Sequence, residues 1–205
     1  MLAIQDKNID PKIIKFGKEE FLNKGFEKAS IRNICRNANV TTGAFYTRYK
    51  NKDELFLDIV SDTLDKINVM MYSEDDMPTF SQDQDGKTDI GWILTDQASS
   101  EIMDFIYDNY DDFRLLLCCA SGSSCEDFLH IFIDKSTELV FDYFNNIKDV
   151  KFELIANKEE LHLIYTSFWT AVFEPVIHEF SREQALRYSK ILSRFFNFEA
   201  IINIY

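Results

Sequence analysis

The chain has 205 residues but only six glycines and three prolines, and this scarcity of helix breakers constrains its fold more than any other feature. A β-sandwich or β-barrel needs many tight turns, and tight turns depend on these two residues. The segments between the breakers instead repeat apolar residues at helical spacing. The sequence therefore predicts an all-α fold, with 19 phenylalanines available for its core.

The N-terminal segment is predicted to form short helices with clear start and stop signals. Asp10 is a good N-cap, and Pro11 suits the first helical position. The helix is expected to run to Gly25, which suits a left-handed helix end. A second short helix is expected after Ser30 and a third after Thr41. Two short helices separated by about four residues form a helix-turn-helix.

Residue types around this turn suit DNA binding. Asn39 stands where the turn needs a left-handed backbone, which Asn tolerates better than most residues. A second helix that starts with small residues can lie deep in the major groove. The hydroxyls and cations that follow can contact the flanking phosphates. The small residues are Thr41, Thr42, Gly43 and Ala44, and the polar and charged ones are Tyr46, Thr47, Arg48, Lys50 and Lys52.

A longer pattern surrounds the turn and covers roughly residues 9–56, about a quarter of the chain. Its features in order are Gly25-Phe26, Ser30-Ile31, Ile34-Cys35, Ala38-Asn39-Val40, the small residues 41–44, Phe45-Tyr46, Tyr49-Lys50 and Lys52-Asp53-Glu54-Leu55. This pattern resembles the N-terminal domain of the tetracycline-repressor (TetR) family. Cys35, Asn39 and Gly17 stand where the family usually has Ala, Gly and Ala, and these departures are sterically mild.

The resemblance implies a homodimer that binds a pseudo-palindromic double-stranded DNA operator, usually as a repressor that a small ligand releases. The residues at base-approaching positions are Thr42, Gly43, Ala44 and Tyr46. Those at phosphate-contacting positions are Thr41, Tyr46, Thr47 and Lys52, and Arg32 is placed to reach the DNA backbone from the preceding helix. We interpret Phe45 and Tyr49 as core residues.

The charge of the chain is unevenly distributed. Its formal net charge is −13, which by itself speaks against a nucleic-acid partner. Residues 1–52, however, contain 11 Lys and Arg against 5 Asp and Glu, a net charge of +6, which leaves −19 for the other 153 residues. The basic segment coincides with the helix-turn-helix. We therefore predict a DNA-binding domain over residues 1–52 and a ligand-sensing and dimerisation domain over residues 53–205.

The predicted second domain is also helical. Asn51 with Glu54 favours the start of a long helix to residue 72. Residues 73–89 are polar and acidic and predict a surface loop. Further helices are expected over residues 90–109, 112–120, 124–146, 157–180 and 181–198, and capping signals precede the last three.

The last two predicted helices are apolar almost all round, more than one core-facing stripe requires. In the family, two such helices from each chain form a four-helix bundle. We therefore predict a dimer interface of Phe168, Val172, Phe173, Ile177, Tyr188, Ile191, Leu192 and Phe195. The alternative is that both helices are buried within a monomer.

An effector pocket is implied between the middle helices, where aromatic walls suit a flat or lipophilic ligand. Its predicted lining is Tyr107, Tyr110, Phe132, Tyr165 and Trp169. Any one aromatic residue at helical spacing lies more often in a core than in a pocket.

Several function classes find no support in the sequence. There is no nucleophile motif, phosphate loop or metal-ligand spacing, so we expect no enzyme activity, cofactor or metal. The longest uncharged apolar stretch, 161–173, has 13 residues and is too short to span a membrane. With no recognisable export signal, a cytoplasmic protein is expected.

Cys118 and Cys119 are interpreted as small buried apolar groups, although thiol sensing stays open. The alternative function is a helical small-molecule-binding or interaction protein without sequence-specific DNA binding, and an activator is not distinguished from a repressor.

Overall fold

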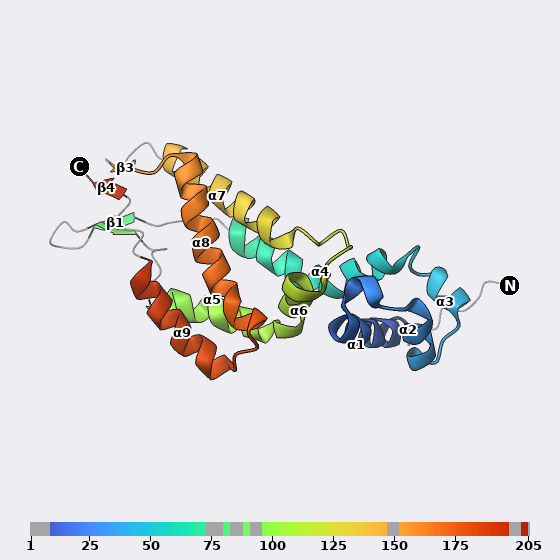
Figure 1. Cartoon of the computed structure of the whole chain (residues 1–205). Coiled ribbons are helices and arrows are strands. Elements are labelled where there is room, and N and C mark those ends of the chain that lie inside the picture. Colours follow the sequence, from blue (N-terminus) through green and yellow to red (C-terminus); the bar gives the residue numbers. More distant parts are fainter. Residues whose placement is uncertain are drawn as a thin grey trace. The chain divides into compact units, whose positions relative to one another are not determined.

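The computed structural model describes residues 9–72, 80–82, 88–90, 96–146, 152–196 and 202–204. These residues are almost entirely helical, which confirms the predicted all-α class (Figure 1). The helices are α1 (Ile9–Lys28), α2 (Ile31–Ala38), α3 (Thr42–Tyr46), α4 (Lys52–Tyr72), α5 (Asp96–Asp108), α6 (Tyr110–Arg114), α7 (Phe128–Asn146), α8 (Lys158–Ile177) and α9 (Arg182–Phe195). A π-helical turn, Leu115–Cys119, follows α6.

Two pairs of three-residue strands accompany the helices. β1 (Phe80–Gln82) pairs antiparallel with β2 (Thr88–Ile90), and β3 (Phe152–Leu154) pairs antiparallel with β4 (Ile202–Ile204). The first pair lies mostly within the predicted loop 73–89, and α5 begins at Asp96 rather than near residue 90. Strands of three residues are too short to show an alternating pattern in the sequence. The prediction of a simple loop was therefore wrong for these residues.

Residue contacts divide the chain into two compact units. The first contains residues 1–66 and 111–128, and the second contains residues 67–110 and 129–205. The π-helical turn belongs to the first unit, where it packs against α1. The predicted domain boundary after Lys52 stays a prediction.

The first unit has an aromatic core at the junction of α1 and α4. The ring centroids of Phe21, Phe26 and Phe56 lie 5.2 to 5.8 Å from one another. Gly25 interrupts α1 with φ 72 and ψ 161. The positive φ agrees with the predicted helix end, but ψ is extended rather than left-handed helical, and a short helical segment follows to Lys28.

The capping signals were right for α8 and α9. Asn157 with Glu160, and Ser181 with Gln184, form complete capping boxes in which each side chain bonds the backbone N–H of the other residue. Both helices end a few residues before their predicted ends. These signals are reliable because all their partners lie within three residues.

Two other predicted caps were wrong. Ser30 makes no side-chain cap; its N–H donates to Glu20 Oε1 at 3.2 Å. Ser124 does not start α7, which begins at Phe128. The N–H of Ser124 instead donates to Asp53 Oδ1 at 2.8 Å. In both cases a distant carboxylate in the first unit provides the acceptor, which a local pattern does not reveal.

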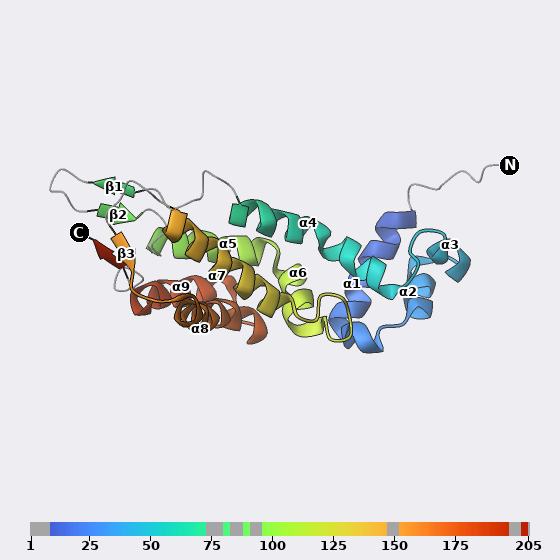
Figure 2. The same cartoon turned by 90° about the horizontal axis from the view of Figure 1, so that it is seen from above.

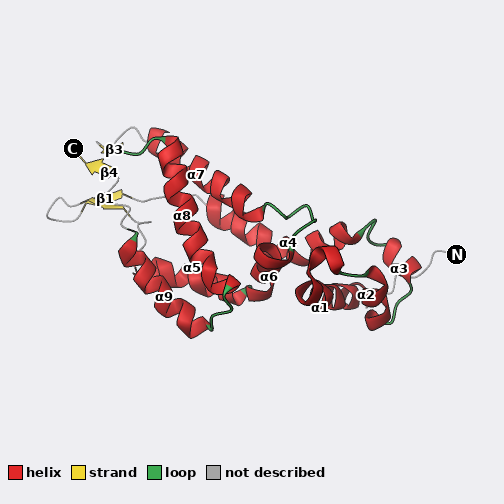
Figure 3. Cartoon of the chain, in the orientation of Figure 1, coloured by secondary structure: helices red, strands yellow, loops and turns green. Residues whose placement is uncertain are grey.

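The second unit is organised around the packing of α5 with α9, which lie side by side in both views (Figures 1 and 2). Arg182 at the start of α9 donates to the carboxylates of Asp104 and Asp108 on α5. The hydroxyl of Tyr107 donates to the carbonyl of Phe180 at 2.8 Å. Figure 3 shows the helices and the two strand pairs of this unit.

Candidate nucleic-acid interface

The turn between α2 and α3 is set by Asn39. Its backbone has φ 55 and ψ 45, the left-handed conformation predicted for this position. The N–H of Val40 donates to the carbonyl of Cys35 at 2.9 Å and closes the end of α2. The path of the chain into α3 therefore follows from local backbone geometry.

α3 is held by hydrogen bonds at both ends. The hydroxyl of Thr41 accepts from the N–H of Ala44 at 3.1 Å, so Thr41 is the N-cap. The hydroxyl of Thr47 donates to the carbonyl of Gly43 at 2.9 Å. A helix of five residues is not stable by itself, so these bonds and the burial of Phe45 maintain it.

The predicted DNA-contacting residues of this segment lie on an open surface. Tyr46 is 57% exposed, whereas Phe45 is fully buried and Tyr49 is 7% exposed. The hydroxyl of Tyr49 donates to Asp58 Oδ2 at 2.7 Å, and burial with this neighbouring carboxylate raises the pKa of Tyr49. The interpretation of Phe45 and Tyr49 as core residues is confirmed. The exposed residues here are Thr41, Thr42, Gly43, Tyr46 and Thr47, and Ala44 is half-buried.

Several cations of the basic segment are bound within the first unit. Arg48 donates to the carboxylate of Asp10 and, at 3.1 Å, to the carbonyl of Ala44. Asp10 lies inside α1, which starts at Ile9, so its predicted role as N-cap was wrong. Arg48 is thereby used to join α1 to α3 rather than left open to a phosphate.

Lys52 is also directed inward, toward the end of α1. Its Nζ donates to the carbonyl of Phe26, to that of Glu27 at 3.1 Å and to that of Ala29 at 3.2 Å. Burial lowers the pKa of this ammonium. An ammonium has three N–H groups, so this arrangement uses all of them. Arg32, by contrast, is exposed and has no hydrogen-bond or ion-pair partner within the part of the chain that the structure describes.

The helix-turn-helix segment matches a known family. Residues 13–59 match the family model described as bacterial regulatory proteins, tetR family. The similarity to the tetR family is thus a property of this segment of the chain. The tetR-family match ends within α4, so it covers the helix-turn-helix and the packing of α1 on α4.

A curated relative is similar to this chain over a longer stretch. The Transposon Tn10 TetC protein of Escherichia coli is 29% identical over 89 residues, which are 43% of this chain and 40% of that protein. The alignment thus spans less than half the length of the relative.

Solved structures share the fold over most of the chain. A transcriptional regulator from Aquifex aeolicus VF5 has a TM-score of 0.60 at 16% identity, covering 92% of this chain and 99% of that one. A TetR-like transcriptional regulator from Rhodococcus sp. RHA1 has a TM-score of 0.58 at 16% identity, with 91% and 93% coverage. At this identity the similarity establishes the fold alone, a helix-turn-helix followed by a helical domain.

The residues predicted to line an effector pocket fall into two pairs and one buried residue. The rings of Tyr107 and Tyr110 lie 5.1 Å apart, and those of Phe132 and Trp169 lie 4.7 Å apart. Tyr165 is 3% exposed, and burial raises its pKa. A small cavity in the second unit is lined by other residues: Ser99, Ile102, Met103, Phe168, Val172, Ser189, Leu192 and Ser193.

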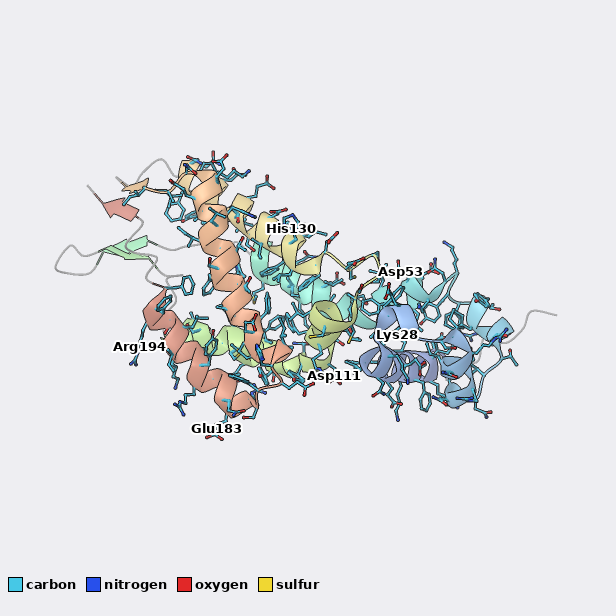
Figure 4. The ribbon with its side chains drawn as sticks, viewed as in Figure 1. Lys28, Asp53, Asp111, His130, Glu183 and Arg194 are labelled. Atoms are coloured by element: carbon cyan, nitrogen blue, oxygen red, sulfur yellow. The ribbon has the colours of Figure 1, made fainter. Side chains whose placement is uncertain are left out.

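The residues predicted for the dimer interface divide by exposure. Four of them are buried within the second unit and are therefore unavailable to a partner: Phe168, Val172, Phe173 and Leu192. Ile177, Ile191 and Phe195 are 41%, 58% and 81% exposed, and Tyr188 is half-buried. Leu163 on α8, which is not among the predicted interface residues, is 66% exposed. Figure 4 shows Glu183 and Arg194 projecting outward from α9.

The cysteines form no disulfide among the described residues, and Cys118 is exposed whereas Cys119 is buried. The interpretation of Cys118 as buried was wrong: in the π-helical turn Leu115, Leu116 and Cys119 are buried, whereas Cys118 is exposed. No helix in the described ranges is long and apolar enough to cross a membrane.

Proposed function

We propose that this protein is a transcriptional repressor that binds a pseudo-palindromic DNA operator as a homodimer and leaves it when a small lipophilic or aromatic effector binds. The observation that carries the proposal is the open surface of Thr42, Gly43 and Tyr46 on α3, beside a turn closed at Asn39. Small side chains and one exposed phenol at the start of a recognition helix suit approach to base edges.

DNA binding is tested by selecting operators for the full chain from a random duplex library. We expect two related half-sites one helical turn or a multiple apart. Tyr46→Ala should weaken binding to the selected operator more than to random DNA. An absence of sequence-specific binding at every salt concentration would overturn the proposal and favour the alternative of a helical small-molecule-binding or interaction protein. A reporter gene under the selected operator then distinguishes repression from activation.

The proposal of a dimer is supported by exposed apolar side chains on α8 and α9. Leu163, Ile177, Ile191 and Phe195 are each more than 40% exposed, and large apolar side chains exposed on two helices suit burial against a second subunit. We expect Phe195→Asp and Ile191→Asp to yield monomers by light scattering. Ile131→Asp on α7, which replaces a side chain that is 46% exposed outside these two helices, is the matched control and should leave the dimer intact.

The effector is proposed to bind near the aromatic cluster of α7 and α8. Trp169 packs on Phe132 and Phe173, and its buried Nε1 has no hydrogen-bond partner within the described part of the chain. A ligand with an apolar body and one acceptor would supply the missing bond. The test titrates long-chain fatty acids and polyaromatic dyes into a Trp92→Phe variant and monitors Trp169 fluorescence. A compound that binds saturably should also release operator DNA, and binding without release would contradict an effector role.

A further inference from the structure

α1 leaves backbone carbonyls without helical partners where Gly25 interrupts it. At a helix end the last carbonyl oxygens need donors from elsewhere. The N–H of Ala29 approaches the carbonyls of Gly25 and Phe26 at 3.1 and 3.2 Å. The carbonyls of Phe26, Glu27 and Ala29 converge on one further donor, the ammonium of Lys52. Lys52 is the first residue of α4, so this contact joins the end of one helix to the start of another.

The surroundings of Lys52 suit a compact cation. Its Nζ lies 4.4 Å from the centre of the Phe26 ring, and that ring is packed against Phe21 and Phe56. A cation is favoured at a helix C-terminus and over an aromatic face. Three converging carbonyls match the three N–H groups of an ammonium, whereas a planar guanidinium presents its donors as a fork.

The position of this contact in the chain gives it consequences beyond local stability. The segment between Ala29 and Lys52 contains α2, the turn at Asn39 and α3. The Lys52 contact joins the residue that follows this segment to the carbonyls that precede it. The contact therefore lies where the chain enters and leaves the helix-turn-helix.

We propose that Lys52 is a positioning residue: it fastens the start of α4 to the end of α1 and supports DNA binding by orienting the helix-turn-helix, without contacting a phosphate. The DNA-binding part of this inference rests on the proposed function. It replaces the phosphate contact that the family resemblance implies for this residue.

Two variants of Lys52 separate the two roles. Lys52→Gln removes the charge, and Lys52→Arg keeps the charge but changes the donor geometry. Arginine is an effective phosphate ligand, so a phosphate contact would survive in Lys52→Arg. A positioning role requires the compact ammonium and would fail in both variants. The matched control is Arg32→Gln, because Arg32 is exposed and has no partner among the described residues.

The first measurement is the melting temperature of the DNA-free protein, which does not depend on the proposed function. We expect both Lys52 variants to melt roughly 3–6 °C below the wild type. Arg32→Gln should melt within about 1 °C of the wild type, as expected for an exposed side chain. Wild-type melting in both Lys52 variants would overturn the proposal.

The second measurement is the salt dependence of operator affinity. Each lost phosphate contact lowers the slope of log K against log salt by about one. We expect this drop for Arg32→Gln, but both Lys52 variants should keep the wild-type slope while affinity falls about tenfold or more. A slope lowered by about one in Lys52→Gln, with full affinity in Lys52→Arg, would overturn the positioning role. If the wild type binds no operator, the proposed function is refuted. The melting temperatures would then still test whether Lys52 fastens α4 to α1.

Discussion

The hydroxyl of Thr63 on α4 donates to Asp112 Oδ2 on α6 at 2.7 Å, and the Thr63 side chain is fully buried. The other carboxylate oxygen of Asp112 lies 2.6 Å from Lys18 Nζ on α1. One carboxylate therefore connects three helical elements of the first unit.

Replacing Asp112 by alanine should destabilise the protein. The change leaves the buried Thr63 hydroxyl without its acceptor, which costs about 1–3 kcal/mol. Urea unfolding measures the loss, and Thr63→Val in the Asp112→Ala background should recover part of it, because it removes the unsatisfied donor. Additive effects of the two substitutions would show that the hydrogen bond contributes nothing.

Gly25→Ala should destabilise the protein although no atom lies within 4 Å of the added methyl group. A φ of 72 with a ψ of 161 is a conformation that is accessible almost only to glycine, and forcing alanine into it costs about 1–3 kcal/mol. The control is Gly43→Ala, whose new methyl group would lie 3.8 Å from Thr41 Oγ1 and whose φ is not positive. Equal melting temperatures for the two variants would contradict this account.

Thr41 and Thr42 should respond differently to the same substitution by valine. Thr41 caps α3, so Thr41→Val should cost about 1 kcal/mol of stability. Its operator affinity should fall evenly across sequences. Thr42→Val keeps the fold and is expected to change base preference at particular operator positions. Melting measures the stability of both variants, and binding to single-base operator variants measures their base preference. Uniform weakening across all operator variants by Thr42→Val would point to a backbone contact.

Tyr107 should make stability sensitive to alkaline pH. Burial, with a smaller effect of Tyr110, raises the pKa of Tyr107 to about 12. Because the folded pKa lies above the unfolded value of about 10, the contribution of Tyr107 is complete below pH 10 and is lost as the pH rises toward 12. Urea unfolding from pH 8 to 11 should show a shallower decline for Tyr107→Phe than for the wild type. Tyr46→Phe, at an exposed position, is the control and should follow the wild-type curve.

Local signals predicted much of the helix-turn-helix. The left-handed Asn39, the Thr41 cap and the burial of Phe45 depend on partners a few residues away or on helical periodicity, and so do the two capping boxes at the starts of α8 and α9. Such features are readable because their partners are close in the chain. The predicted DNA contacts themselves stay predictions.

The side chains whose partners lie far along the chain were predicted less well. The contact from Lys52 to the carbonyl of Phe26 crosses 26 residues, and that from Arg48 to Asp10 crosses 38. Apolar periodicity also failed to separate buried Leu192 from exposed Ile191, because both lie in a segment that is apolar on more than one face.

By itself, the sequence determined the helical class, the site of the helix-turn-helix and the conformation of its turn, because these follow from interactions between near neighbours. The tertiary structure alone decided which cations remain available to a phosphate, which apolar side chains of α8 and α9 face outward, and where residues 111–128 pack. Those outcomes depend on which distant carbonyl, carboxylate or ring a side chain meets once the helices have packed.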